Sequence, residues 1–186
     1  MKIRLARPLQ LDSIVDGEGI RTVIWTQGCS HNCPGCHNPQ THSFKGGFLK
    51  DVDELKEEIS NLKLQDGITF SGGDPMFQSQ VCAEIAKHCK KLNLNVWCYT
   101  GFTFEQLLSM AKYKPSIMEF LENIDVLVDG KFIEKLKSYD LMFRGSNNQR
   151  IIDVQKSLKK NKVVIVEKYK KKKIIDVGYP SNCINH

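Results

Sequence analysis

Apolar and polar positions alternate along this chain in two different periods. Short runs rich in β-branched and aromatic residues, bounded by glycine or turn residues, predict strands. These runs cover residues 19–26, 67–71, 93–99, 124–128, 163–166 and 173–177. Segments whose apolar residues recur at close to helical spacing predict helices. They cover residues 51–64, 76–92 and 103–113, with shorter helical segments at 117–121 and 131–138.

Strands that alternate with helices of ten or more residues predict βαβ units and a mostly parallel sheet. A closed eight-fold barrel needs about 200 residues or more, and this chain of 186 residues supplies four or five units at most. We therefore expect an α/β fold built as an open, partial βα barrel. Its chemistry would lie in residues 1–155, and residues 156–186 would form a lysine-rich extension that packs on the same domain or trails from it.

Composition is ordinary for a soluble globular protein, with 26% charged and 41% hydrophobic residues. No apolar run reaches the length that spans a membrane. The first residues carry charges but no apolar stretch typical of a signal peptide. We expect a cytoplasmic protein without a membrane partner, whose seven cysteines are reduced thiols or metal ligands.

The net charge of +6 is concentrated near the C-terminal end. Residues 156–173 hold nine lysines and one acidic residue, Glu167, so this segment carries +8 and the rest of the chain −2. Such a segment is either a basic surface for nucleic acid or an acidic protein, or a solvated chain end. Tyr169 is its one aromatic residue. Without a stacking platform, nucleic acid is not the expected partner.

Unusual segments follow four of the predicted strands. Residues 29–36, 71–75, 100–101 and 129–131 each come directly after a strand. Ligand-binding loops of parallel sheets gather at the carboxyl ends of the strands. If the strands are ordered as in the sequence, the four segments converge on one edge of the sheet.

Cys29, Cys33 and Cys36 have the spacing C-x3-C-x2-C. A four-iron cluster normally takes one thiolate per iron, so three thiolates would leave one iron open to a small molecule. Zinc completed by His31 or His37 is an alternative, although structural zinc sites usually pair two separated ligand pairs. Haem attachment at C-x-x-C-H and a thioredoxin-like dithiol at Cys33 and Cys36 are further alternatives. The dithiol leaves Cys29 without a role.

Three other segments have residues suited to binding a small molecule. Gly72 and Gly73 allow close approach of backbone to a ligand, and Asp74 adds negative charge, although an ordinary strand-to-helix turn has the same pattern. His37 has a planar ring that could pack against a base, or it is a solvated loop residue. Asp129 and Lys131 end a strand, and they form either a cofactor contact or a weak surface ion pair.

The remaining cysteines show no spacing for a second cluster. Cys82 and Cys89 lie two helical turns apart, about 10 Å along the axis, which is too far for a disulfide. Buried free thiols are the expectation for Cys82, Cys89 and Cys98. Cys183 is expected to be an exposed thiol.

Together these segments resemble the radical S-adenosylmethionine (radical-SAM) activases of glycyl-radical enzymes. Within that group the chain is most similar to the activating proteins of anaerobic ribonucleoside-triphosphate reductase. The segments that carry the resemblance are DGEGIR (16–21), QGCSHNCPGCHNP (27–39), ITFSGGDP (68–75), WCYTG (97–101), DVLVDGKF (125–132) and FRGSNNQR (143–150). The resemblance runs from about residue 14 to residue 154 and excludes the lysine-rich segment.

The resemblance implies specific roles. The three cysteines would hold a 4Fe–4S cluster, and the methionyl amino and carboxylate groups of S-adenosylmethionine would chelate the open iron. The cofactor-binding residues it implies are Gly72, Gly73 and Asp74 at the methionyl amino group, Gly35 and His37 at the adenine, and Asp129 and Lys131 at the end of the pocket. Where Asp74 stands, many relatives carry Glu, but Asp is usual in the reductase-activating branch.

The resemblance also implies the reaction. One electron from a donor such as flavodoxin or ferredoxin would cleave S-adenosylmethionine to methionine and a 5′-deoxyadenosyl radical. That radical would remove a hydrogen atom from a glycine of the anaerobic ribonucleoside-triphosphate reductase. The alternatives are a radical-SAM enzyme that acts on another glycyl-radical protein or on a small molecule, and a non-enzymatic zinc-binding module.

Overall fold

One open sheet with a parallel centre forms the framework of the protein. The computed structural model describes residues 1–169. The central strands lie side by side in sequence order and run parallel: β3 (Arg21–Thr26), β5 (Gly67–Gly72), β6 (Asn95–Tyr99) and β7 (Val126–Asp129). Antiparallel strands extend both sides, namely β1 (Lys2–Leu5), β2 (Gln10–Ser13) and β4 (Phe48–Asp51) beyond β3, and β8 (Arg150–Asp153) beyond β7.

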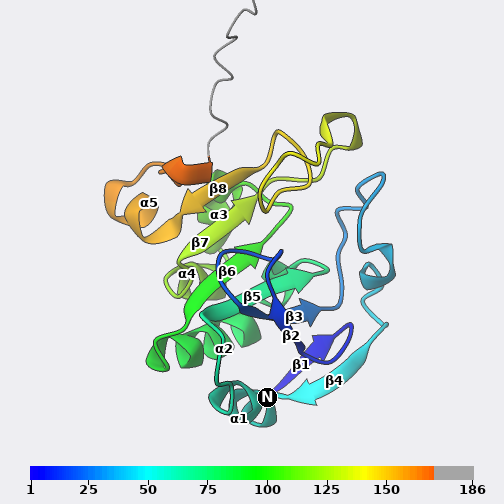
Figure 1. Ribbon diagram of the computed structural model, residues 1–186, viewed down its shortest axis with the longest axis vertical. Coiled ribbons are helices and arrows are strands. Elements are labelled where there is room, and N and C mark those ends of the chain that lie inside the picture. Colours follow the sequence, from blue (N-terminus) through cyan, green and yellow to red (C-terminus); the bar gives the residue numbers. More distant parts are fainter. Residues whose placement is uncertain (170–186) are drawn as a thin grey trace, which may run out of the picture.

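Five α-helices are described, and Figure 1 shows their arrangement around the sheet. They are α1 (Val52–Ser60), α2 (Ser79–Lys91), α3 (Phe104–Ala111), α4 (Ser116–Leu121) and α5 (Val154–Lys160). Four short 3-10 turns complete the elements: η1 (Pro39–Thr41), η2 (Pro75–Gln78), η3 (Glu134–Leu136) and η4 (Glu167–Tyr169). The blue segment after β3 and the yellow segment after β7 both extend beyond the same end of the sheet in Figure 1.

Local sequence explains where the first and third helices begin. The Asp51 carboxylate accepts a hydrogen bond from the Asp53 backbone N–H at 2.9 Å, as expected for a helix N-cap. Thr103 and Gln106 form a reciprocal capping box at the start of α3.

Within residues 1–169 there is no helix both long enough and apolar enough to cross a membrane.

Alternation along the strands gives the sheet two unlike faces. One face packs against α1 to α4 through a continuous apolar core that includes Ile24, Phe70 and Leu127. The other face, which we call the open face, carries a smaller aromatic and aliphatic cluster around Trp97 and Val128. The helices therefore stabilise one side of the sheet, and the open face is left for other contacts.

Arg21 is a buried cation on the open face, with 1% of its surface exposed. Its guanidinium donates to the Thr69 hydroxyl at 2.6 Å and to the backbone carbonyls of Ile68 at 2.6 Å and Asn95 at 2.9 Å. Burial lowers the pKa of Arg21 to about 10. The side chain thus ties the amino-terminal ends of β3, β5 and β6 together through neutral acceptors.

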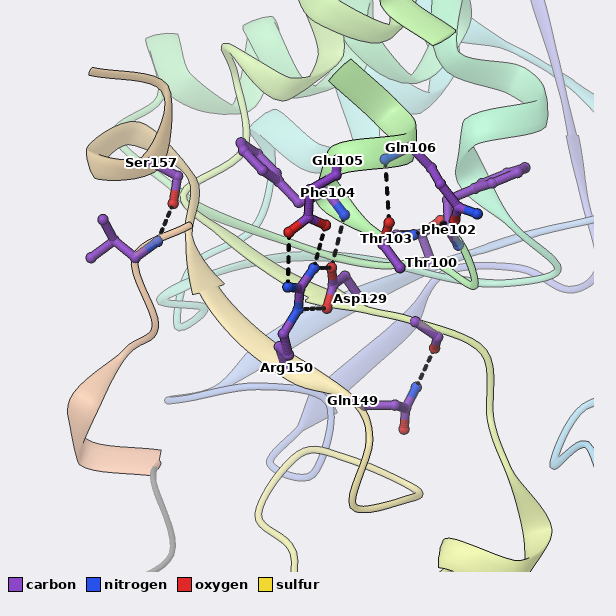
Figure 2. A network of polar contacts seen from close by, with 12 residues as sticks. Thr100, Phe102, Thr103, Phe104, Glu105, Gln106, Asp129, Gln149, Arg150 and Ser157 are labelled. Atoms are coloured by element: carbon purple, nitrogen blue, oxygen red, sulfur yellow. Dashed lines mark hydrogen bonds and ion pairs between the residues drawn. The ribbon is translucent and has the colours of Figure 1, made fainter. Parts of the chain in front are cut away.

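A clamp of charged side chains fixes α3 to the end of the sheet. Arg150 donates from Nε to the Asp129 carboxylate at 3.0 Å and from Nη2 to Glu105 at 2.7 Å. The same Asp129 carboxylate accepts from the Phe104 backbone N–H at 2.8 Å, in the first turn of α3. Figure 2 shows Arg150 between the two carboxylates. The bidentate geometry makes this a stronger pairing than an ordinary surface ion pair.

The described part of the C-terminal segment packs on the open face. Backbone hydrogen bonds join it to β8, from the Asp153 N–H to the Val164 carbonyl and from the Val166 N–H to the Ile151 carbonyl, both at 2.9 Å. Tyr169 ends this segment, and 7% of its surface is exposed. Its ring stacks edge-on against Trp97 and Phe143, with centroid distances of 6.0 and 5.4 Å. The Tyr169 hydroxyl donates to Glu18 at 2.9 Å.

The predicted central strands and the longer helices are confirmed, with ends shifted by a few residues, and the sheet is open as expected. Two predictions were wrong. Residues 131–138 form one 3-10 turn where a helix was predicted, because hydrogen bonds to Ser146 and Asn147 hold them in an extended loop. Residues 163–166 make one isolated bridge to β8 and form no strand. The strand expected at 173–177 lies outside the described residues.

We expect Tyr169 to contribute to the stability of the whole fold. Tyr169→Ala should lower the free energy of unfolding of the full chain by about 3 kcal/mol, because it removes a buried aromatic ring. Tyr169→Phe keeps the ring and should cost about 1 kcal/mol or less, through loss of the hydroxyl bond to Glu18. Urea denaturation measures both values. An unchanged midpoint for Tyr169→Ala would show that the packing adds no stability.

The Glu105–Arg150 contact should make stability depend on pH in the acid range. The hydrogen bond from Arg150 lowers the pKa of Glu105 from 4.5 to about 2. The contribution is therefore complete above about pH 5 and disappears as pH falls toward 2. Because the Glu105 side chain is 58% exposed, Glu105→Gln should cost about 1 kcal/mol or less at pH 7. Urea titrations at pH 7 and pH 2 should show this difference shrinking, whereas the exposed Glu122→Gln control should show none at either pH.

Candidate active site

The loops after the four parallel strands line one cleft of about 620 Å³. The cleft lies at the carboxyl ends of these strands, where α/β proteins bind ligands. It includes residues from all four segments singled out in the sequence, represented by Cys29, Gly72, Thr100 and Gly130. The expected convergence of these segments on one edge is therefore confirmed.

The three clustered cysteines all face this cleft. Cys29, Cys33 and Cys36 are each half-buried and line its wall. The loop begins on fixed backbone, because the Gly28 N–H donates to the Thr41 carbonyl at 2.8 Å and the Cys29 N–H to the His42 carbonyl at 3.0 Å. A tight turn between Cys33 and Cys36 is closed by a backbone hydrogen bond of 3.1 Å.

Gly35 lets the second half of the cysteine loop lie close to the segment after β7. Its φ of +69° lies in the left-handed region, and a Cβ at this position would lie 2.7 Å from the Glu134 carboxylate. Gly35 is not among the residues that line the cleft. Its contact with an adenine ring stays a prediction, whereas its role in the turn follows from its backbone conformation.

Burial favours the neutral thiol form of Cys29 and Cys33 in the protein alone. Burial raises the pKa of Cys29 to about 11 and also raises the pKa of Cys33. Thiolates are the form that binds metal, so a bound metal centre would supply the positive charge that stabilises them. Metal binding at these cysteines would therefore release protons.

The donor set fits an iron–sulfur cluster by its chemistry. Within residues 1–169, no three His, Cys, Asp or Glu side chains lie close enough together to hold a single metal ion. A four-iron cluster makes a different demand, because each thiolate binds its own iron and the ligands are spread around the cluster. Three cysteine sulfurs on one cleft wall meet that demand.

Gly72 and Gly73 bring the turn after β5 against the backbone of the cysteine loop. The Gly73 N–H donates to the Thr26 carbonyl at 2.7 Å. A Cβ on Gly73 would lie 2.4 Å from the Gly28 carbonyl oxygen, and Gly72 has a φ of +102°. Both glycines also line the cleft. The close approach seen here is between two backbone segments, and the predicted contact with a cofactor remains a prediction.

Asp74 occupies a buried position with its carboxylate fully bonded. It is 1% exposed. Its carboxylate accepts from the Met76 N–H at 2.9 Å, the Thr100 hydroxyl at 2.9 Å, the Gly101 N–H at 2.9 Å and His31 Nε2 at 2.6 Å. The carboxylate therefore joins three loops, and a contact with a methionyl amino group stays a prediction.

Within the described residues Asp129 pairs with Arg150 and forms no ion pair with Lys131. The Asp129 carboxylate is 1% exposed and is bonded to Arg150 and to the first turn of α3, as Figure 2 shows. Lys131 is exposed. Neither side chain is part of the cleft wall, whereas Gly130 between them is. The geometry gives Asp129 a structural role, and a cofactor contact of either residue stays a prediction.

His37 lies on the cleft wall next to an aromatic ring. Its imidazole centroid is 4.8 Å from that of Phe132, which also lines the cleft. Two flat rings from different loops thus border one part of the cleft. This arrangement suits packing against a planar base.

The sequence did not reveal the role of the loop at residues 143–149, which lines one wall of the cleft. Arg144 and Gln149 lie on this wall. Gln149 accepts from the Gly145 N–H at 2.8 Å and donates to the Gly130 carbonyl at 3.0 Å, which closes the loop on itself. The Arg144 Nε is buried and unbonded within the described residues, and burial lowers the pKa of Arg144. The segment FRGSNNQR was visible in the sequence only as part of a resemblance.

Cys82, Cys89 and Cys98 are buried free thiols, as predicted. Burial raises the pKa of Cys89 to about 12 and also raises those of Cys82 and Cys98. They are therefore inert toward metal and oxidant in the folded protein. Cys183 lies outside the described residues.

Comparisons with known proteins agree with this site. Residues 15–152 match the family described as "4Fe-4S single cluster domain". The anaerobic ribonucleoside-triphosphate reductase-activating protein of Salmonella typhimurium is 34% identical over 144 residues, which covers 73% of this chain and 90% of that protein. The protein of the same name from Escherichia coli K12 is 34% identical over 145 residues with the same coverage.

The matched region contains all four loops that line the cleft. A phage T4 protein of the same name is 33% identical over 144 residues, covering 74% of this chain and 86% of the phage protein. The family match begins before the cysteine loop and ends within β8. On the strength of this site and these relatives, the chain belongs to the family of anaerobic ribonucleoside-triphosphate reductase-activating proteins.

Proposed function

We propose that this protein is a radical-SAM activase that generates a glycyl radical on the anaerobic ribonucleoside-triphosphate reductase. The observation that carries the proposal is the placement of Cys29, Cys33 and Cys36 on one cleft wall beside the Gly72–Gly73 turn. The family match to a 4Fe–4S domain and the names of the relatives support the same reading.

The three cysteines would hold a 4Fe–4S cluster with one iron left open for the amino and carboxylate groups of S-adenosylmethionine. A cluster held there would supply one electron for reductive cleavage of S-adenosylmethionine to methionine and a 5′-deoxyadenosyl radical, which would take a hydrogen atom from a glycine of the partner. A flavodoxin or ferredoxin would provide the electron. We assign this chemistry to a domain of residues 1–155. Residues 156–186 would be a lysine-rich C-terminal extension of that domain.

The chain's own residues would bind, orient and shield the cofactor. The Gly72–Gly73 turn lines the cleft with backbone groups and carries no side chains. His37 and Phe132 border the part of the cleft suited to the adenine ring. The contacts implied for Gly35, Asp74, Asp129 and Lys131 belong to the same proposal. A volume of about 620 Å³ lies within the range of small-molecule sites.

The partner must reach the cofactor inside the cleft. Hydrogen transfer requires near-contact between the glycine and the 5′-carbon, so the reductase would insert a loop. The open sheet leaves the cleft accessible for such a loop. Because thiolate ligands require reduced cysteines, we further propose that the protein works in the cytoplasm without oxygen.

Replacing one cluster ligand should abolish cofactor cleavage. Wild-type protein, reconstituted anaerobically with iron and sulfide, should form 5′-deoxyadenosine from S-adenosylmethionine and dithionite in the presence of the reductase. Cys33→Ala should reduce this product by about a hundredfold or more, because the cluster loses one of three ligands. Cys89→Ala, which removes a buried thiol of α2 that is not part of the cleft wall, is the matched control and should retain the activity. Product is measured by liquid chromatography.

Iron content separates the outcomes. A wild-type protein that holds zinc, binds no iron and forms no product would contradict the proposal and favour a zinc-binding module. Equal product from Cys33→Ala and wild type would remove the cysteine assignment.

The reductase should acquire a radical on a glycine. After incubation with the loaded activase, the reductase should show an electron paramagnetic resonance signal whose doublet collapses when the glycine is labelled with deuterium at Cα, because that hydrogen splits the signal. A loaded activase that cleaves S-adenosylmethionine but leaves the reductase without this signal would point to a different substrate.

A further inference from the structure

His31 lies in the middle of the first spacer of the cysteine loop, between Cys29 and Cys33. Its side chain is 7% exposed, and its Nε2 lies 2.6 Å from the Asp74 carboxylate. The other partners of this carboxylate, from Met76, Thr100 and Gly101, are all donors. A carboxylate only accepts, so His31 donates from Nε2.

The space around the imidazole is shaped to hold a ring. Phe102 meets it edge-on at a centroid distance of 4.5 Å, and Phe77 lies at 5.8 Å. A Cβ on Gly101 would lie 2.4 Å from His31 Cδ2. Gly101 therefore provides the space that the ring occupies, and the ring position is set by two segments, the one around η2 and the one after β6.

The backbone–backbone hydrogen bonds of the rest of the cysteine loop lie at its two ends. Backbone bonds fix Gly28 and Cys29 at the beginning, and the Cys33–Cys36 turn closes the end. His31 adds a charge-assisted bond to the part between them. Its acceptor, Asp74, follows Gly73 directly in the sequence. The Asp74 carboxylate also caps the first turn of η2.

We propose that His31 is a positioning residue whose hydrogen bond to Asp74 fixes the cysteine loop relative to the Gly72–Gly73 turn. This inference rests on the proposed function, because that loop would hold the cluster and that turn would meet the cofactor. Both halves of the cofactor site then belong to one rigid unit. The bond sets the orientation of Cys29 and Cys33, so His31 acts on the cluster site through the loop that carries these two cysteines.

Two substitutions separate the ring from the hydrogen bond. His31→Phe keeps an aromatic ring between Phe77 and Phe102 but has no donor. His31→Gln keeps a donor N–H but has no ring. His88→Phe is the matched control, because His88 on α2 also makes a side-chain contact, at 2.9 Å to the Ser60 hydroxyl, and lies outside the cleft wall. Circular dichroism of the full-length metal-free proteins confirms that each variant folds.

The first readout uses protein without metal. Alkylation by iodoacetamide, resolved for each cysteine by mass spectrometry, reports how often the loop opens. His31→Phe should speed alkylation of Cys29 and Cys33 by about tenfold, as expected for loss of one hydrogen bond to a charged group. His31→Gln should be slower than His31→Phe, and His88→Phe should match the wild type. Cys82 and Cys89 serve as internal controls and should be unchanged.

The second readout uses reconstituted protein. Addition of S-adenosylmethionine should change the electron paramagnetic resonance signal of the reduced cluster in the wild type. In His31→Phe this change should be weaker, and KM for S-adenosylmethionine should rise by about tenfold with iron content unchanged. His31→Gln should recover part of both effects.

The outcomes distinguish this inference from the proposed function. Alkylation rates in His31→Phe equal to those of wild type would overturn the positioning role, as would equal behaviour of the Phe and Gln variants. If wild-type protein neither binds a cluster nor cleaves S-adenosylmethionine, the proposed function fails, and the alkylation of metal-free protein still decides whether His31 fixes the loop.

Discussion

A carboxylate placed where water cannot reach it must find its hydrogen-bond donors within the protein, and Asp74 is in that position. Its partners come from the cysteine loop, from η2 and from the segment after β6. Because an unsatisfied buried charge costs several kcal/mol, these three segments cannot separate without a large penalty. The geometry of the candidate active site follows from this requirement, since it holds together loops that the sheet alone would only bring near one another.

Glycine makes the same junction possible on the backbone side. The turn after β5 approaches the start of the cysteine loop so closely that no Cβ fits at Gly73, and the imidazole of His31 occupies the space that a side chain at Gly101 would fill. The segments after β3, β5 and β6 are thus in close contact at buried positions, where the glycines leave room for a neighbouring backbone or ring. Side chains such as His37 remain free to meet a ligand, and the rigidity of the site does not depend on them.

The central βα pattern could be predicted because β3, β5, β6 and β7 are each a short apolar run bounded by turn residues. The edge strands could not, since β1, β4 and β8 have four residues each with polar and charged residues among them, and only pairing with neighbours makes them strands. The cysteine and glycine positions of the site could be predicted, because their spacing after the strands is visible in the sequence. The hydrogen bond between His31 and Asp74 could not be predicted, because it joins residues 43 positions apart and no local pattern encodes a contact of that range.

The packing of the C-terminal segment on the open face has a consequence for folding during synthesis on the ribosome. Glu18, near the start of the chain, is bonded to Tyr169, 151 positions later. The parallel centre of the sheet can assemble as its βα units emerge, but the aromatic cluster around Trp97 stays exposed until Tyr169 has left the ribosome. Translation order therefore places the covering of this cluster after assembly of the parallel strands, and a nascent chain that stalls before residue 169 would present that apolar surface to chaperones or to other chains.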